Sequence, residues 1–237
     1  MALLADLEAD IINVLSASWD IRDGQVVPST EKVALAGGGV KLTATMLYAD
    51  LADSTALAMW DRRVSARVCK AFLASASRLI RASGGEVRSF DGDRVMGVFV
   101  GDTKNTSAIK CAMKINYVFE KLLRPKFTAK YEKLRDGTYK LGQCTGVDTS
   151  EVLVVRAGIR NNNDLIWIGR APNVAAKLSA LRDSPFNTFI SGAVFGSANG
   201  EVKTSADGRD MWEERSWSAG PVKRVFAHPG HGSLEPF

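Results

Sequence analysis

Long apolar segments, a signal-like N-terminus and paired cysteines are all missing from this 237-residue chain. Without a run of about 18 apolar residues, the sequence offers no candidate for a membrane-spanning helix. The N-terminus also lacks a basic stretch followed by an apolar one, so we expect no secretory signal and a cytoplasmic location. Cys69, Cys111 and Cys144 show no C-x-x-C spacing, which favours reduced thiols over a disulfide framework.

Clustered positive charge is missing as well, although the formal net charge is +5. The densest basic stretch, residues 124–140, has the character of an exposed connection and lacks the interleaved aromatic residues of a nucleic-acid-binding surface. A mildly basic surface explains the charge without a polyanionic partner, and one nucleoside triphosphate would suit it as well as a nucleic acid. We therefore expect no nucleic-acid partner and no membrane partner.

The first forty residues are expected to form an N-terminal helix and a linker, ahead of a catalytic domain at 41–237. Apolar residues at helical spacing predict an amphipathic helix over residues 3–16. The glycines at 37–39 are not followed by the Lys-Ser/Thr of a phosphate-binding loop, so residues 17–40 are interpreted as a flexible linker.

The rest of the chain alternates predicted strands and helices. The expected elements are a strand at 43–48, a helix at 53–82, strands at 86–90 and 94–100 joined by an Asp91-Gly92 hairpin, a helix at 103–123 stopped by Pro125, strands at 142–147, 152–159 and 165–168, a helix at 173–181, and strands at 189–190 and 224–227. This order indicates an α+β fold with a ferredoxin-like βαββαβ core, an antiparallel sheet with helices packed on it.

Two aspartates lie at the ends of predicted strands. Asp50 follows a buried strand, and Asp93 follows the hairpin turn. If the two strands are neighbours, both carboxylates lie at one end of the sheet, where they could hold Mg²⁺ ions for phosphoryl transfer. On spacing alone, a turn-forming or helix-capping role for each aspartate explains the pattern at least as well.

Four segments around these aspartates resemble, in order, the motifs of class III adenylate and guanylate cyclases. They are Met46 to Thr55, Phe90 to Phe99, Gly146 to Val152 and Gly169 to Leu178, within residues 43–190. The first two resemble the family's metal-binding motifs, and the last resembles the helix that carries its transition-state residues. Residues 200–237 form a C-terminal extension outside the resemblance, in which only Lys223 is a candidate for reaching the triphosphate.

The resemblance implies a two-metal site. Asp50, Asp93 and the backbone carbonyl of Leu51 would hold two Mg²⁺ or Mn²⁺ ions, so that the ribose 3′-hydroxyl attacks the α-phosphate and pyrophosphate leaves. Backbone amides of Ala52, Asp53, Ser54 and Thr55, at the start of a helix, would hold phosphate oxygens. An ordinary helix cap is the simpler interpretation of those four residues, and both can hold together.

The resemblance also assigns catalytic roles to Asn173 and Lys177, which share a helix face. Asn173 would orient the ribose, and Lys177 would stabilise charge on the α-phosphate. The family usually has Arg at the second position, so Lys177 keeps the charge but loses the bidentate fork, and Arg170 could share its role. An exposed surface lysine is the alternative. Because these residues come from the partner subunit in the family, the resemblance implies a homodimer with shared active sites.

The residues that select the base in this family differ here. Ser89 and Arg170 replace the Lys and Asp of adenylate cyclases, and Tyr48 adds a hydroxyl beside the metal residues. Losing both purine contacts should redirect specificity. The pattern is similar to the bacterial Pycsar pyrimidine cyclases, which implies UTP, or else CTP, as substrate. The product cUMP or cCMP would then act as a second messenger in anti-phage defence, through a separate cyclic-nucleotide-activated effector.

Other interpretations remain open. An adenylate or guanylate cyclase with an unusual pocket is the first, and a non-catalytic nucleotide-binding or dimerisation module is the second. A ferredoxin-like RNA-binding domain is a third, although the basic-aromatic strand signature of that fold is not visible here.

Overall fold

In the computed structural model, residues 2–230 are described, and they fall into two compact units. The first contains the residues up to Thr43 together with Glu151–Gly169, and the second contains Ala44–Ser150 and the residues from Arg170 onward. Two long strands, β2 (Gly38–Ala52) and β5 (Gly142–Ile159), each contribute to both units. No helix within the described residues is long and apolar enough to cross a membrane.

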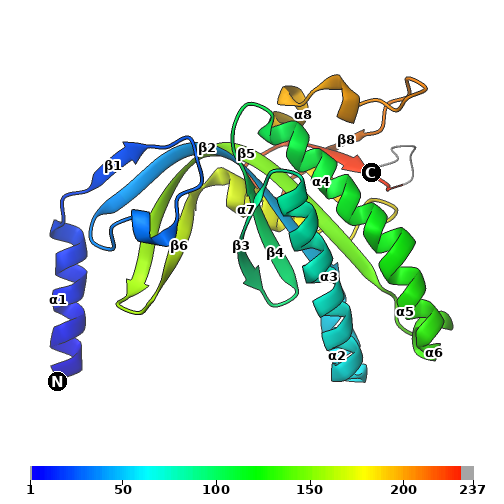
Figure 1. Ribbon diagram of the computed structural model, residues 1–237, viewed down its shortest axis with the longest axis horizontal. Helices are drawn as coiled ribbons and strands as arrows, with labels where there is room; N and C mark the ends of the chain where they lie inside the picture. The colour runs from blue at the N-terminus through cyan, green and yellow to red at the C-terminus, as the bar shows by residue number, and fades with distance from the viewer. Residues whose placement is uncertain (1, 231–237) are drawn as a thin grey trace. The chain divides into compact units, whose positions relative to one another are not determined.

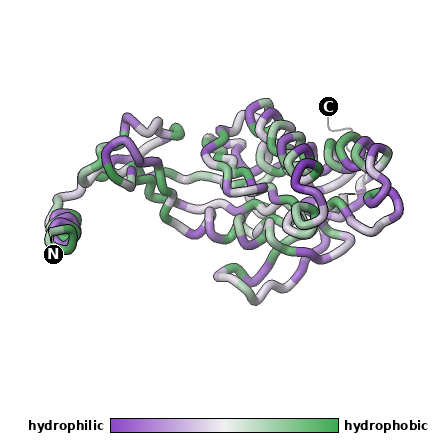
Figure 2. Tube along the Cα trace, turned by 90° about the horizontal axis from the view of Figure 1, so that it is seen from below, coloured by the Kyte–Doolittle hydropathy of each residue, from purple (hydrophilic) through white to green (hydrophobic). Residues whose placement is uncertain are grey.

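The first unit contains α1 (Ala2–Ser16), β1 (Asp20–Asp23), η1 (Thr30–Lys32), β6 (Asn162–Gly169) and parts of β2 and β5. The amphipathic helix predicted at residues 3–16 is present as α1, which carries both hydrophobic and hydrophilic residues (Figure 2). None of its residues 2–16 is buried. The expected linker is more ordered than predicted, because β1 pairs in parallel with β2, with Ile21 opposite Gly39. β6 pairs antiparallel with β5.

The second unit is built on a mixed sheet (Figure 1). Its strands are β3 (Glu86–Asp91), β4 (Arg94–Phe99), β7 (Thr188–Ser191), β8 (Glu213–Ser216) and β9 (Arg224–His228), together with parts of β2 and β5. Their order is β3-β4-β2-β5-β7-β9-β8. The predicted antiparallel sheet is wrong in one respect: β5 and β7 are parallel, with Gly146 opposite Phe189. A parallel pair needs a crossover connection, which α7 (Arg170–Ser179) supplies between them.

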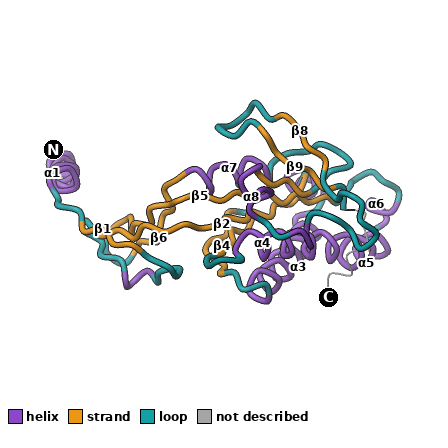
Figure 3. The backbone as a smooth tube through the Cα atoms, turned by 90° about the horizontal axis from the view of Figure 1, so that it is seen from above, coloured by secondary structure: helices purple, strands orange, loops and turns teal. Residues whose placement is uncertain are grey.

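Helices cover both faces of this sheet. Leu47, Ala49 and Leu51 of β2 enter the main core, which also contains buried residues of α3 (Arg62–Ala82) and α4 (Lys104–Val118). Strand side chains alternate, so Tyr48 and Asp50 point to the opposite face. That face carries α7 (Figure 3). Val174 and Leu178 of α7 pack with Cys144 and Phe189.

Two predicted helices are divided in the structure. The helix expected at 53–82 is α2 (Ser54–Trp60) followed by α3, because the Asp61 side chain accepts hydrogen bonds from the amides of Arg63 and Val64 and so begins a new helix. Pro125 was expected to stop the helix at 103–123. Instead α4 continues through η2 (Phe119–Leu123) into α5 (Arg124–Lys130), where the proline occupies the first turn, a position at which proline is tolerated.

Other predicted boundaries differ less. The strands expected at 142–147 and 152–159 are one continuous strand, β5, and the hairpin at Asp91-Gly92 is confirmed, with Gly92 in the left-handed region at φ 61°. The short remaining helices are α6 (Glu132–Arg135), α8 (Gly192–Ser197) and η3 (Gly200–Val202).

Candidate active site

The ends of β2 and the β3–β4 hairpin bring Asp50 and Asp93 to one place. β2 and β4 pair antiparallel with Asp50 opposite Arg94, so Asp93 is adjacent to the residue that faces Asp50. Both side chains are half-buried. They line a single cavity of about 540 Å³, here called the Asp50 cavity, whose other described lining residues are Leu51, Asp53, Ser54, Thr55, Ala56, Met59 and Arg182.

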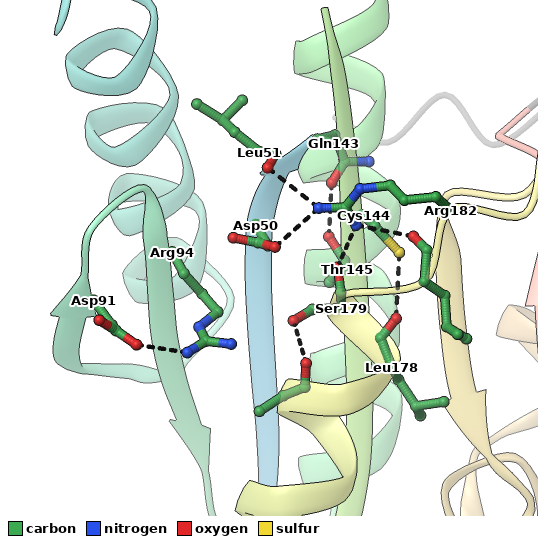
Figure 4. Close-up of polar contacts among 12 residues, drawn as sticks. Asp50, Leu51, Asp91, Arg94, Gln143, Cys144, Thr145, Leu178, Ser179 and Arg182 are labelled. Carbon is green, nitrogen blue, oxygen red and sulfur yellow. Dashed lines mark hydrogen bonds and ion pairs between the residues drawn. The ribbon is translucent and has the colours of Figure 1, made fainter. Parts of the chain in front are cut away.

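A cation from another part of the chain enters this cavity. Arg182 Nη2 donates to Asp50 Oδ2 over 3.1 Å and to the carbonyl oxygen of Leu51 over 3.3 Å (Figure 4). Burial raises the pKa of the Asp50 carboxyl, the Asp93 carboxylate raises it further, and the hydrogen bond from Arg182 opposes both. The cavity therefore holds two neighbouring carboxylates, and a cation beside them stabilises their ionised forms.

The donor set fits a hard divalent ion. The Asp50 carboxylate and the Leu51 carbonyl converge on one guanidinium nitrogen, so the guanidinium marks a position where a cation contacts both oxygens. Mg²⁺ is commonly held by one or two carboxylates plus substrate phosphates rather than by an all-protein cage. No cluster of three or more His, Cys, Asp or Glu side chains suited to a metal occurs among residues 2–230.

The residues expected to hold phosphates are only partly brought together. Asp53, Ser54 and Thr55 line the Asp50 cavity, whereas Ala52 lines a neighbouring cavity of about 340 Å³. Asp53 has φ 57° and ψ 25°, a left-handed conformation that few residues other than glycine adopt. Such backbone turns cluster at functional sites, which is consistent with a binding role for this loop.

Two residues expected to select the base are neighbours across the sheet. Tyr48 and Ser89 both lie opposite Met96 in the strand registers, one on each side of it. The Tyr48 hydroxyl donates to Met96 Sδ over 2.8 Å, and the Arg94 guanidinium lies 5.4 Å from the centre of the tyrosine ring. Tyr48 is two residues before Asp50 in β2, so both side chains lie on the same face of the sheet. Met96 lies opposite Tyr48 in the register and Ser89 lies opposite Met96, so both belong to that face as well.

Arg170, the third residue expected to select the base, is engaged by the protein itself. Its guanidinium lies 3.2 Å from both carboxylate oxygens of the buried Asp148, and it also donates to the carbonyl oxygen of Thr149. Burial raises the pKa of Asp148, while a hydrogen bond from Ser191 and the charge of Arg170 oppose this rise. Arg170 thus has a fixed position at the beginning of α7.

The residues expected from the helix motif lie away from the carboxylates. Asn173 and Lys177 occupy the exposed side of α7, and Lys177 Nζ lies 3.4 Å from the carbonyl oxygen of Ala219. Of the described residues, neither these two nor Lys223 lines the Asp50 cavity. The structure therefore does not bring both halves of the predicted site together within one chain.

Neither Arg182 nor Asp148 was predicted as a site residue from the sequence. Arg182 follows the helix motif by a few residues and belongs to none of the four motifs, so only the fold reveals its contact with Asp50. Asp148 lies inside the third motif, and its position in a buried strand was the one signal that could have identified it as a charged partner.

Comparisons with known proteins agree with the motifs. No protein-family profile matches the chain. A uridylate cyclase from Rhodovulum sp. (strain MB263) is 49% identical over 92% of this chain and 91% of its own length. Uridylate cyclases from Burkholderia cepacia and Xanthomonas perforans are 39% and 36% identical, each over 92% of this chain and 93% of its own length.

Solved structures show a common fold at low identity. The adenylyl cyclase CyaB from P. aeruginosa matches with a TM-score of 0.69 and 18% identity, over 84% of this chain and 98% of its own. The guanylyl cyclase Cya2 matches with a TM-score of 0.64 and 18% identity, over 84% and 97%. The resemblance to class III cyclases is thereby confirmed, and the chain is a nucleotide cyclase, a phosphorus–oxygen lyase that belongs to the uridylate cyclase family.

Proposed function

We propose that this enzyme converts UTP to 3′,5′-cyclic UMP and pyrophosphate with two divalent metal ions, with CTP as the alternative substrate. The observation that carries the proposal is the convergence of the Asp50 carboxylate and the Leu51 carbonyl on one cation position, in a cavity that also contains Asp93. Relatives named uridylate cyclase at up to 49% identity support the choice of base.

The chain's own groups would bind and orient the nucleotide. Asp50, Asp93 and the carbonyl of Leu51 would hold Mg²⁺ or Mn²⁺, ions that lower the pKa of the ribose 3′-hydroxyl and neutralise the triphosphate when bound. Backbone amides between Ala52 and Thr55 would hold phosphate oxygens. The 3′-oxygen then forms a bond to the α-phosphorus, the bond to the β-phosphate oxygen breaks, and the 3′-hydroxyl proton is released to solvent.

Selection of the base would rest on the side-chain hydroxyl groups of Ser89 and Tyr48. Ser89 and Tyr48 flank Met96 on the face of the sheet that carries Asp50, so they could approach a small pyrimidine ring. Arg170 would act through its pair with Asp148, by fixing the start of α7, the helix that carries Asn173 and Lys177. A site that hydrogen-bonds one base strongly rejects another whose groups do not match, because its polar atoms are left unpaired.

Completion of the site would require a second subunit. Asn173 and Lys177 are exposed on α7, so a partner in a head-to-tail homodimer could supply them to the Asp50 cavity. Asn173 would orient the ribose, and Lys177 would stabilise charge on the α-phosphate in place of the usual arginine. The cyclic product would activate a separate effector as an anti-phage second messenger.

An assay with each of the four nucleotides tests the proposal. Purified protein is incubated with ATP, GTP, CTP or UTP and Mn²⁺, and the cyclic product is identified by mass spectrometry. We expect cUMP from UTP. Efficient formation of cAMP or cGMP with UTP and CTP inert would favour a purine cyclase, and no product from any nucleotide would favour a non-catalytic binding module.

A further inference from the structure

Arg182 is held by both of its terminal nitrogens between two parts of the site. Nη1 donates to the carbonyl oxygens of Ser179 and Leu181, each over 2.9 Å, at the end of α7. Nη2 donates to Asp50 Oδ2 and to the Leu51 carbonyl (Figure 4). One planar guanidinium therefore connects the last turn of α7 with the two oxygens assigned above to a metal ion.

The charge of the cavity wall explains why a cation lies there. Among the residues described at the wall of the Asp50 cavity, Arg182 is the one cation, and it shares that wall with the side chains of Asp50, Asp53 and Asp93. Because the guanidinium is hydrogen-bonded to Asp50 in a cavity that Asp93 also lines, its positive charge offsets part of the repulsion between these two carboxylates.

A guanidinium and a metal ion cannot use these oxygens at the same time. Mg²⁺ binds oxygen at about 2.0–2.1 Å, so an ion in contact with both Asp50 and the Leu51 carbonyl would take the place of Nη2. Two cations in contact would also repel each other strongly. Metal binding therefore requires the side chain to move, and 38% of its surface is already exposed to solvent.

We propose that Arg182 occupies the metal position of the nucleotide-free enzyme and that a divalent ion binds by displacing its side chain. The proposal rests on the assignment of Asp50 and Leu51 as metal ligands. Displacement exchanges ion pairs: Asp50 gains the metal, and the freed guanidinium gains the phosphates that arrive with it. Arg182 thus keeps the affinity for free metal low until a nucleotide offers the guanidinium another partner.

Metal binding without nucleotide tests this directly. Mn²⁺ is titrated into the full-length protein, and free Mn²⁺ is followed by electron paramagnetic resonance. We expect Arg182→Ala and Arg182→Gln to bind Mn²⁺ roughly three- to tenfold more tightly than the wild type, because no cation has to leave. Arg182→Gln preserves side-chain volume, so it serves if the alanine variant does not fold.

Arg215→Ala is the matched control. Arg215 pairs with Asp183 beside Arg182, so the variant removes an equal charge nearby without vacating the metal position, and its Mn²⁺ affinity should stay close to that of the wild type. Unchanged or weaker Mn²⁺ binding in both Arg182 variants would overturn the inference. Asp50→Ala separates the two proposals, because Mn²⁺ binding that survives this change would overturn the metal assignment itself.

Discussion

At the scale of single residues, the site depends on a few polar groups whose surroundings set their charge. Asp50 is half-buried, and burial together with Asp93 raises its pKa, so a cation stabilises its ionised form. Arg182 supplies that cation in the structure. Asp148 is fully buried and is paired with Arg170, so its charge is compensated within the fold.

Thiol reactivity gives a prediction at the same scale. Burial raises the pKa of Cys111 and Cys144 to about 12, and Cys69 is only partly buried. At pH 8 a thiol with that pKa is about one part in ten thousand thiolate, so neither buried cysteine should react with iodoacetamide in the native protein. Mass spectrometry should find slow labelling of Cys69 alone, and labelling of all three cysteines in urea.

Native labelling of Cys111 or Cys144 at the rate of a free thiol would contradict this picture. The comparison is internal, because Cys69 reports on reagent access in the same sample. The result also bears on the expectation from sequence that the cysteines are reduced, since none of the three forms a disulfide in the structure.

At the scale of elements, the break between α2 and α3 separates the phosphate loop from the long core helix. The carboxylate of Asp61 accepts from the amides of Arg63 and Val64. Removal of this cap by Asp61→Ala should lower the free energy of unfolding by about 1 kcal/mol, measured by urea denaturation. Asp61→Asn retains an acceptor and should be close to the wild type. Equal stability of all three proteins would show that the cap contributes nothing.

The packing of α7 on β5 gives a second prediction about elements. A Cβ at Gly146 would lie 2.2 Å from the carbonyl oxygen of Ala175 and 2.5 Å from the amide nitrogen of Ser179. Gly146→Ala should therefore push α7 off the sheet, with a loss of about 1–3 kcal/mol in the free energy of unfolding and lower cyclase activity.

Gly196→Ala is the control for this change. Gly196 has no neighbour within 4 Å of an added Cβ, so its replacement should leave stability and activity nearly unchanged. A Gly146→Ala protein as stable and as active as the wild type would mean that the close contact between α7 and β5 is not required.

The elements also show which parts of the structure could be predicted from the sequence. The β3–β4 hairpin and β2 were predictable because their signals are local: a turn dipeptide and a run of apolar residues. The split at Asp61 was missed because an aspartate that caps a new helix looks, in sequence, like a surface residue inside one long helix. The continuation past Pro125 was missed because a proline in the first turn of a helix looks the same in sequence as a proline that ends one. The parallel pairing of β5 with β7 depends on tertiary contacts that no local pattern encodes.

The candidate site divides in the same way. Asp50 and Asp93 were predicted from ordered motifs, and the fold places them at one cavity, while their metal-binding role stays a prediction. Arg182 could not be predicted from the sequence, because its partner Asp50 lies 132 positions earlier in the chain. The fixed position of Arg170 was also missed, because its partner Asp148 is distant in sequence.

At the scale of the whole molecule, the proposed dimer makes a quantitative prediction. In a head-to-tail dimer, a mixture of Asp50→Asn and Asn173→Ala subunits forms heterodimers in which one site carries both changes and the other carries neither. Random exchange of equal amounts should restore about a quarter of the wild-type activity. Activity no greater than the sum of the two separate variants, with exchange verified by native mass spectrometry, would contradict shared sites.

The central claim is that the Asp50 cavity makes cUMP with bound metal ions, and carboxylate variants test it most directly. Formation of cUMP from UTP and Mn²⁺ is measured for the wild type, Asp50→Asn, Asp93→Asn and Asp91→Asn. Asp91 is the control, because it pairs with Arg94 in the same hairpin and does not line the cavity. We predict that Asp50→Asn and Asp93→Asn lose at least about a hundredfold in activity while Asp91→Asn stays near the wild type. Wild-type rates of cUMP formation in either cavity variant would contradict the account.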